Sequence, residues 1–178
     1  MSKKRIISAI GILLASVLVI MGAGKLSRES KDYAAEFIEE FYTITDYETY
    51  SYARANPYAN VYTADRLARE NYSSYFTEDG MDEFISDGVQ QIFEEMVYSM
   101  NCTSRIGEIT LEKVSSDTSE RSYTYDFDVT VIVTDTNGND NNVEQHGTVS
   151  VSKKNEMKIT SFKVIDSMSV IRAVSSMY

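Results

Sequence analysis

A run of eighteen apolar residues near the N-terminus, Ile6 to Ala23, constrains this chain more than any other feature. It contains no charged side chain, and a helix of this length, at about 1.5 Å rise per residue, can just cross a hydrocarbon core of roughly 30 Å. A cleaved secretory signal is the alternative, because Gly22 to Gly24 are small enough for a cleavage site. The apolar part of such a signal is usually only about 7 to 15 residues long. We therefore favour an uncleaved transmembrane anchor.

Both alternatives export the remainder of the chain. Basic residues lie on both flanks of the apolar run, at Lys3 to Arg5 and at Lys25 to Lys31, so the positive-inside rule favours an inside N-terminus only slightly. The five residues before the run cannot form a domain. We predict a single-pass protein of the cytoplasmic membrane with its C-terminal domain outside the cytoplasm, and secretion after signal cleavage is the alternative localisation.

The exported part is strongly acidic. The whole chain has 17 basic and 27 acidic residues, and without Lys3 to Arg5 the balance is 14 to 27, a formal charge of −13. This charge repels phosphate backbones and anionic headgroups, so we expect neither a direct nucleic-acid ligand nor a peripheral membrane-binding face. Basic proteins and cations remain as partners.

Two classes of transition-metal site lack ligands in this sequence. Cys102 is the only cysteine and His146 the only histidine, which excludes thiolate zinc sites and His-rich metal sites. Cys102 ends an apolar helical stripe, so a buried inert thiol is favoured over an intermolecular disulfide. Asp135 to Asn139 resembles the start of a calcium loop, but its glycine is at the fourth position where the sixth is required, so a hairpin turn explains it better.

Catalytic groups are equally scarce. We expect His146 to be solvated at the start of a strand, and alternation places Asp126 and Asp128 on the solvent face of another. Exposed carboxylates have little reason for shifted pKa values. If the two aspartates have a function, a negative contact surface explains them better than a catalytic pair does. A role in solubility alone is favoured over both. We predict no catalytic residue, no metal and no cofactor, and hence no enzyme.

The first half of the domain has helical periodicity. Apolar residues recur at helical spacing from Tyr33 to Ile44, and Thr63 looks like the cap of a second helix reaching about Tyr75. We expect a break at Thr77 to Gly80 and another helical turn at Met81 to Ile85. The strongest helical stripe, within Asp87 to Asn101, comprises Val89, Ile92, Phe93, Met96, Val97 and Met100.

From Arg105 the apolar period changes to two. A first strand is centred on Ile109, and a long second strand has Tyr123 to Val133 alternating on one face. Asn137-Gly138 predicts a hairpin, Val143 to Ser152 the return strand, and Ile159 to Ile165 a fourth. The fold class is therefore α+β: an N-terminal transmembrane helix, then three or four helices packed on a curved four-stranded antiparallel sheet. The predicted parts are an anchor (1–24), a linker (25–31), a domain (32–166) and a tail (167–178).

This order of elements resembles the nuclear transport factor 2-like, or cystatin-like, superfamily. The resemblance rests on the apolar helix Val89 to Met100 followed by strands centred on Ile109, Phe127, Val149 and Phe162. A single-span protein with its helices before its strands is similar to the assembly-factor subunits of type IV secretion and conjugation machines. That similarity implies a domain outside the cytoplasmic membrane that contacts other machine components.

Tyrosine is the most unusual feature of the composition, with eight between Tyr42 and Tyr75. Tyrosine combines a large contact area with a polar tip and is common both at half-buried helix surfaces and at interfaces. The sequence thus predicts a membrane-anchored extracytoplasmic scaffold that binds envelope proteins and leaves homo-oligomerisation open. A small-molecule-binding or catalytic domain using the helix–sheet cavity is the alternative. We assign partner binding to Tyr50, Tyr52, Tyr58 and Tyr62.

Overall fold

The computed structural model describes residues 27–45, 60–89, 93, 97, 100–154 and 156–165. The predicted anchor, most of the tyrosine-rich segment and the C-terminal tail lie outside these residues. Among the helices that are described, none is both long enough and apolar enough to span a bilayer.

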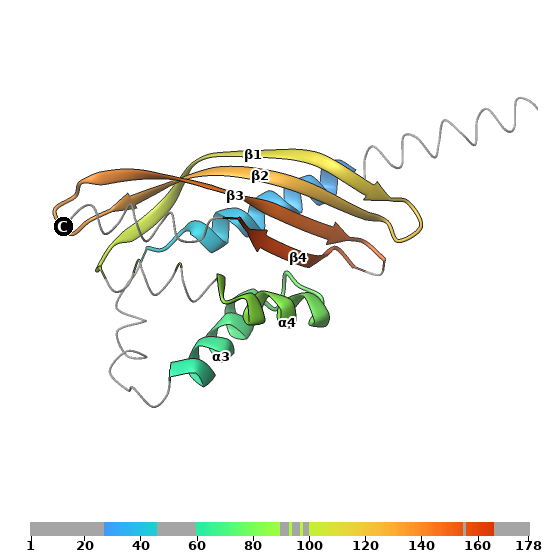
Figure 1. The fold of residues 1–178 in the computed structure, drawn as a ribbon, viewed down its shortest axis with the longest axis horizontal. Coiled ribbons are helices and arrows are strands. Elements are labelled where there is room, and N and C mark those ends of the chain that lie inside the picture. Colours follow the sequence, from blue (N-terminus) through green and yellow to red (C-terminus); the bar gives the residue numbers. More distant parts are fainter. Residues whose placement is uncertain are drawn as a thin grey trace, which may run out of the picture.

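Four antiparallel strands form one sheet in the order in which they occur in the chain (Figure 1). They are β1 (Thr103–Asp117), β2 (Ser122–Thr134), β3 (Asp140–Ser152) and β4 (Lys158–Val164). In β2 and β3 buried and more exposed residues alternate, as the period of two predicts. The predicted four-stranded meander is confirmed, and β3 begins three residues earlier than expected.

The turn between β2 and β3 has the chemistry that the sequence predicts. Gly138 has a φ of 83°, which glycine adopts without strain. Asp135 closes the turn, because its carboxylate accepts hydrogen bonds from the backbone N–H groups of Asn137 and Asn139, both at 2.8 Å. A hairpin turn therefore explains these residues.

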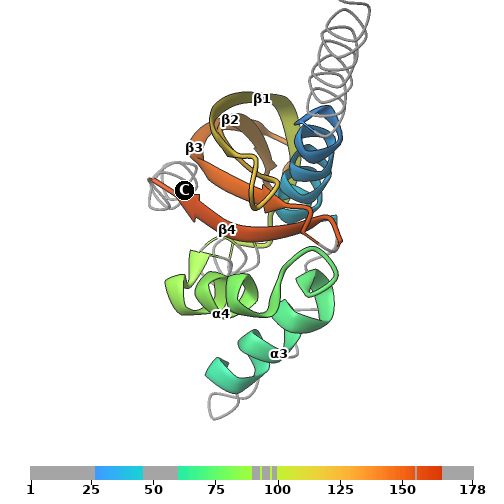
Figure 2. The ribbon, with the colours of Figure 1, turned by 90° about the vertical axis from the view of Figure 1, so that its right-hand side faces the viewer.

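Two irregularities in β1 were not anticipated from the sequence. The register with β2 shifts between Ile106 and Glu108 and again between Lys113 and Ser115. Such bulges bend a strand and increase its twist. Figure 2 shows the resulting sheet curling around the helix of residues 27–42, called helix 27–42 below.

Helix 27–42 is helical from Ser27, the first described residue, which lies within the predicted linker, and it buries Ala34, Phe37, Ile38 and Phe41. The predicted helical stripe extended to Ile44, which is wrong. Ile44 instead exchanges two backbone hydrogen bonds with Ser104 of β1, at 2.9 and 2.8 Å.

The next two helices lie beside β4. α3 (Asn60–Tyr72) ends three residues earlier than predicted, and Thr63 lies inside it, so the prediction that Thr63 caps this helix is wrong. α4 (Glu78–Asp87) packs on β4, with α3 on its far side from the sheet (Figures 1 and 2). The predicted break between the helices is confirmed but lies at residues 73–77 instead of Thr77 to Gly80, and the predicted helical turn Met81 to Ile85 is part of α4. Thr77 is the N-cap of α4 and its hydroxyl accepts a hydrogen bond from the Gly80 N–H at 3.1 Å.

Gly80 is needed for close packing, since a Cβ there would lie 2.8 Å from the carbonyl oxygen of Ile159 in β4. The strong stripe that follows is helical and buried where it is described, at Val89, Phe93 and Val97. This agrees with the predicted core-facing helix.

Aromatic rings fill the space between helices and sheet. The ring centroid of Phe37 lies 5.0 Å from those of Phe76 and Phe162, and the rings of Phe127 and Phe162 stack at 5.3 Å with an interplanar angle of 2°. These rings connect all layers of the domain, and we call them the aromatic core. Its members are Phe37, Phe41, Tyr72, Phe76, Phe84, Phe93, Phe127 and Phe162.

Candidate functional site

The tyrosines assigned to partner binding are not placed by the structure. Tyr50, Tyr52 and Tyr58 lie outside the described residues, and Tyr62 belongs to α3 but its side chain is outside them. Their role in binding stays a prediction.

The described tyrosines at the two ends of the same cluster belong to the core. Tyr42 and Tyr72 are buried, and desolvation raises the pKa of both hydroxyls. Tyr75 is half-buried. Its pKa is raised mainly by burial, and secondly by the hydrogen bond that its hydroxyl donates to Glu40 at 2.5 Å. At these three positions tyrosine serves packing, as in a half-buried helix surface.

The outer, convex face of the sheet gathers acidic side chains. Alternation along β1, β2 and β3 points five exposed carboxylates to this face, which we call the acidic face. Its defining residues are Glu108, Glu112, Asp126, Asp128 and Glu144.

Two members of the acidic face oppose each other directly. Glu112 of β1 pairs in register with Asp126 of β2. Side chains at such positions lie about 5 Å apart at Cβ, and like charges there destabilise a sheet. Neither carboxylate, nor that of Glu108, has an ion-pair partner among the residues that the structure describes. The face therefore presents uncompensated negative charge.

His146 also lies on the acidic face, as expected for a solvated histidine. It is opposite Asp128 in the register, and its Nδ1 pairs with the Asp128 carboxylate. Both side chains are more than half exposed. An exposed pair of this kind contributes little to stability, and nothing buried orients it for proton transfer.

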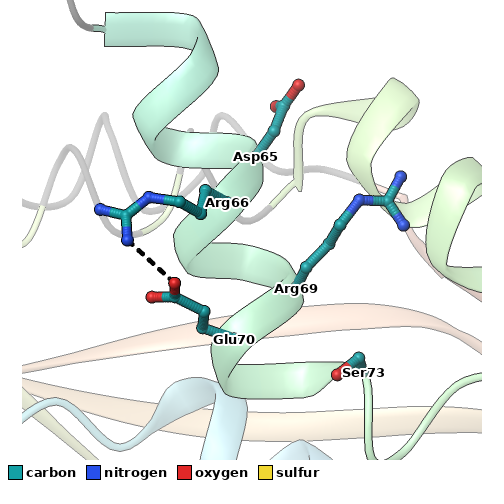
Figure 3. A pocket seen from close by; sticks show the side chains of 5 residues that line it. All are labelled: Asp65, Arg66, Arg69, Glu70 and Ser73. Atoms are coloured by element: carbon teal, nitrogen blue, oxygen red, sulfur yellow. Dashed lines mark hydrogen bonds and ion pairs between the residues drawn. The ribbon is translucent and has the colours of Figure 1, made fainter.

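An open hollow of about 590 Å³ lies on α3 (Figure 3). Its walls come from one helix and the residue after it: Asp65, Arg66, Arg69, Glu70 and Ser73. Arg66 donates to Glu70 at 2.9 Å, and Arg69 pairs with Asp82 of α4. Because both guanidinium groups already have carboxylate partners, a ligand would have to displace them, and we assign none.

The remaining candidates have structural roles. Cys102 is fully buried, in agreement with an inert thiol. A metal site is also not found: within the described ranges, no group of three or more His, Cys, Asp or Glu side chains is arranged to hold a metal ion. The sequence identified Asp126 and Asp128 as surface carboxylates, but it did not identify Glu112 opposite Asp126, because that pairing depends on the bulge in β1 between Lys113 and Ser115.

Comparison with known proteins assigns no family. No protein-family model and no curated protein matches the chain. One solved structure that resembles it is described as a periplasmic fragment of TraM, with a TM-score of 0.46 and 10% sequence identity over 78% of this chain and 96% of that one. This level of similarity assigns neither a family nor a function, and the resemblance to the nuclear transport factor 2-like superfamily stays a prediction.

Proposed function

We propose that this chain is a membrane-tethered, extracytoplasmic interaction protein that binds other envelope proteins through the surface of its domain. The aromatic core carries this proposal. A ligand or substrate in a helix-on-sheet fold would occupy the cavity between the two layers, where apolar walls and a few polar groups converge. In this domain the described part of that space is packed with rings at van der Waals distance. Binding at the surface is the alternative that this packing favours over a catalytic or small-molecule site.

The acidic face is the surface that we assign to a partner. The opposed pair Glu112 and Asp126 costs stability and leaves negative charge exposed in the middle of the sheet. A partner with a basic surface would neutralise these carboxylates, and long-range attraction would speed the encounter. The predicted anchor would bring the domain to other envelope proteins, and an assembly such as a conjugation machine is the setting that the order of elements favours.

Neutral substitutions test this assignment. We expect the double variant Glu112→Gln, Asp126→Asn to lose partners that the tagged full-length protein recovers from solubilised membranes. The same variant should unfold at a higher temperature, since removing a like-charge pair stabilises a sheet by about 0.2 to 1 kcal/mol. Loss of binding could then not be attributed to unfolding.

A matched control neutralises two exposed carboxylates on helix 27–42, Glu36→Gln and Glu39→Gln, and should retain the partners. Equal recovery by both double variants would show that the acidic face is not the contact surface.

The tyrosine-rich segment provides a second test of the scaffold. Replacing Tyr50, Tyr52, Tyr58 and Tyr62 in pairs by Ser should abolish partner recovery and leave the domain folded, because interface energy concentrates in a few aromatic anchors worth about 2 kcal/mol or more each. Function lost on His146→Ala and kept in the tyrosine variants would favour the catalytic alternative.

A further inference from the structure

The end of the domain at which helix 27–42 begins must lie close to the membrane if the predicted anchor is present. Only Gly24, Lys25 and Leu26 separate Ala23, the last residue of the apolar run, from Ser27. Three residues span at most about 11 Å. The inference below therefore depends on the anchor in the proposed function.

Two connections of the sheet lie at this end. The hydroxyl of Tyr125 donates to the Ser27 carbonyl at 2.7 Å, and Lys153, just after β3, pairs with Glu29 at 3.1 Å. Lys153 N–H in turn donates to the carbonyl of Arg121 in the β1–β2 turn at 3.1 Å. Figure 1 shows the β1–β2 turn and the end of β3 at the same right-hand end of the sheet as the start of helix 27–42. We call residues 27–32, 113–123, 152–154 and 156–157 the anchor-side end.

Charge is distributed very unevenly between this end and the remainder of the domain. The residues that the structure describes include 11 basic and 22 acidic ones. The anchor-side end has six of the basic and five of the acidic ones, a net charge of +1, which leaves five basic and 17 acidic side chains, or −12, for the rest of the described residues. Its basic residues are Arg28, Lys31, Lys113, Arg121, Lys153 and Lys154.

The anchor-side end also exposes an apolar side chain. Val114, in the second bulge of β1, is 52% exposed. Among the described residues, Ile165 is the one other large hydrophobic residue that is exposed. Lys113, the neighbour of Val114, is in register with Tyr125, which contacts Ser27. An exposed apolar residue next to a basic one, on an end with five further basic side chains, is a combination found on surfaces that contact the lipid interface.

We propose that the anchor-side end docks on the headgroups of the bilayer that holds the anchor, and that anionic lipids strengthen this contact. Lys153 and Lys154 already pair with Glu29 and with Glu120, the latter at 2.7 Å. The other basic side chains of this end, Arg28, Lys31, Lys113 and Arg121, would pair with lipid phosphates, and Val114 would contact the apolar side of the interface. The acidic remainder of the domain is repelled by the same headgroups. Attraction at one end and repulsion elsewhere therefore hold the domain in one orientation relative to the bilayer. The net charge of the whole domain predicts no membrane-binding face, because it averages over these two opposed regions.

Depth-dependent quenching tests the docking. The full-length chain, with Cys102→Ala to remove the native thiol, receives one fluorophore at Thr118→Cys in the β1–β2 turn and is reconstituted into vesicles with brominated anionic lipids. A matched sample has the fluorophore at Thr136→Cys, at the other end of β2, about 40 Å away. We expect strong quenching at 118, weak quenching at 136, and much weaker quenching at 118 in vesicles of zwitterionic lipids.

Charge variants complete the test. Each basic residue near an anionic leaflet strengthens the contact about fivefold, so the triple variant Arg28→Gln, Lys31→Gln, Arg121→Asn should weaken docking roughly a hundredfold. Asn suits position 121 because Arg121 has a φ of 50°. A control variant that removes two exposed basic groups far from the anchor, Arg66→Gln and Arg105→Gln, should dock normally.

The outcomes separate this inference from the proposed function. A protein that does not float with the vesicles has no anchor, and both proposals fail. A protein that floats but shows equal, weak quenching at 118 and 136 retains its anchor, and only the docking is overturned. Equal quenching at 118 in anionic and zwitterionic vesicles would overturn the role of headgroup charge.

Discussion

Gly147 in the middle of β3 is the position where the structure predicts the clearest effect of a small change. A Cβ built on Gly147 would lie 2.1 Å from the carbonyl oxygen of Lys163 and 2.5 Å from the ring of Phe127, whereas ordinary contacts of a Cβ begin at 3.4 Å. The ring of Phe127 lies against this glycine and stacks on Phe162. Gly147→Ala therefore forces both a ring and a backbone group to move.

The size of the destabilisation depends on which of these two neighbours can move. A ring can turn, but the Lys163 carbonyl belongs to the β4 backbone, so β3 and β4 must separate by about 1 Å and their pairing weakens. Overpacking of this kind costs about 1 to 3 kcal/mol, and the lower entropy of Ala in the unfolded chain offsets only about 0.4 to 1 kcal/mol. We expect Gly147→Ala to lower the free energy of unfolding by about 1 kcal/mol.

Chemical unfolding followed by tyrosine circular dichroism measures this change, since the chain has 13 tyrosines and no tryptophan. Gly107→Ala in β1 is the matched control: its Cβ would meet the end of the Ile132 side chain at 3.0 Å, and that side chain can rotate away. Adding Phe127→Leu to Gly147→Ala should not restore stability, because the backbone contact persists. Equal stability of the Gly147 and Gly107 variants would refute this account of the sheet.

Three further predictions concern the core, a turn and the anchor. Phe93→Ala should cost about 3 to 5 kcal/mol, measured by chemical unfolding, because this ring is buried between helix and sheet. Hydrogen bonds from Asn139 hold the pKa of Asp135 below its usual range, so the unfolded chain takes up this proton first as the pH falls. The stability advantage of the native protein over Asp135→Asn should therefore be constant above about pH 5 and shrink below about pH 4. Membrane fractions should retain full-length protein with its domain open to external protease, whereas a soluble species beginning near Lys25 would establish a cleaved signal.

The β half of the fold could be predicted from the sequence because each of its signals is local. Alternation from Tyr123 to Val133 identifies the buried face of β2, and Asn137-Gly138 marks the hairpin. The bulges at Gly107 and Val114 could not be predicted, since they show only when two strands are aligned. The pairing of Glu112 with Asp126, which defines the acidic face, depends on that alignment.

Helix ends were less predictable because capping and tertiary contact compete for the same residues. Thr77 to Gly80 has the composition of a turn, yet Thr77 caps α4 and Gly80 allows its first turn to approach β4. Ile44 continues the apolar spacing of helix 27–42, but a pair of hydrogen bonds with Ser104 ends that helix at residue 42. Neither outcome is visible without the strand that each segment meets.

The short contacts between the helical layer and the sheet also influence how copies of this domain coexist. Ile44 pairs with Ser104 at one margin of the sheet, and Phe76 pairs with Ile159 at the other. An open strand margin is a template for addition of another chain, and a protein tethered in a membrane meets its neighbours at high local concentration. The bridges satisfy backbone groups of Ser104 and Ile159, and the bulges bend β1, so the sheet of a neighbouring copy meets an obstructed margin at these points.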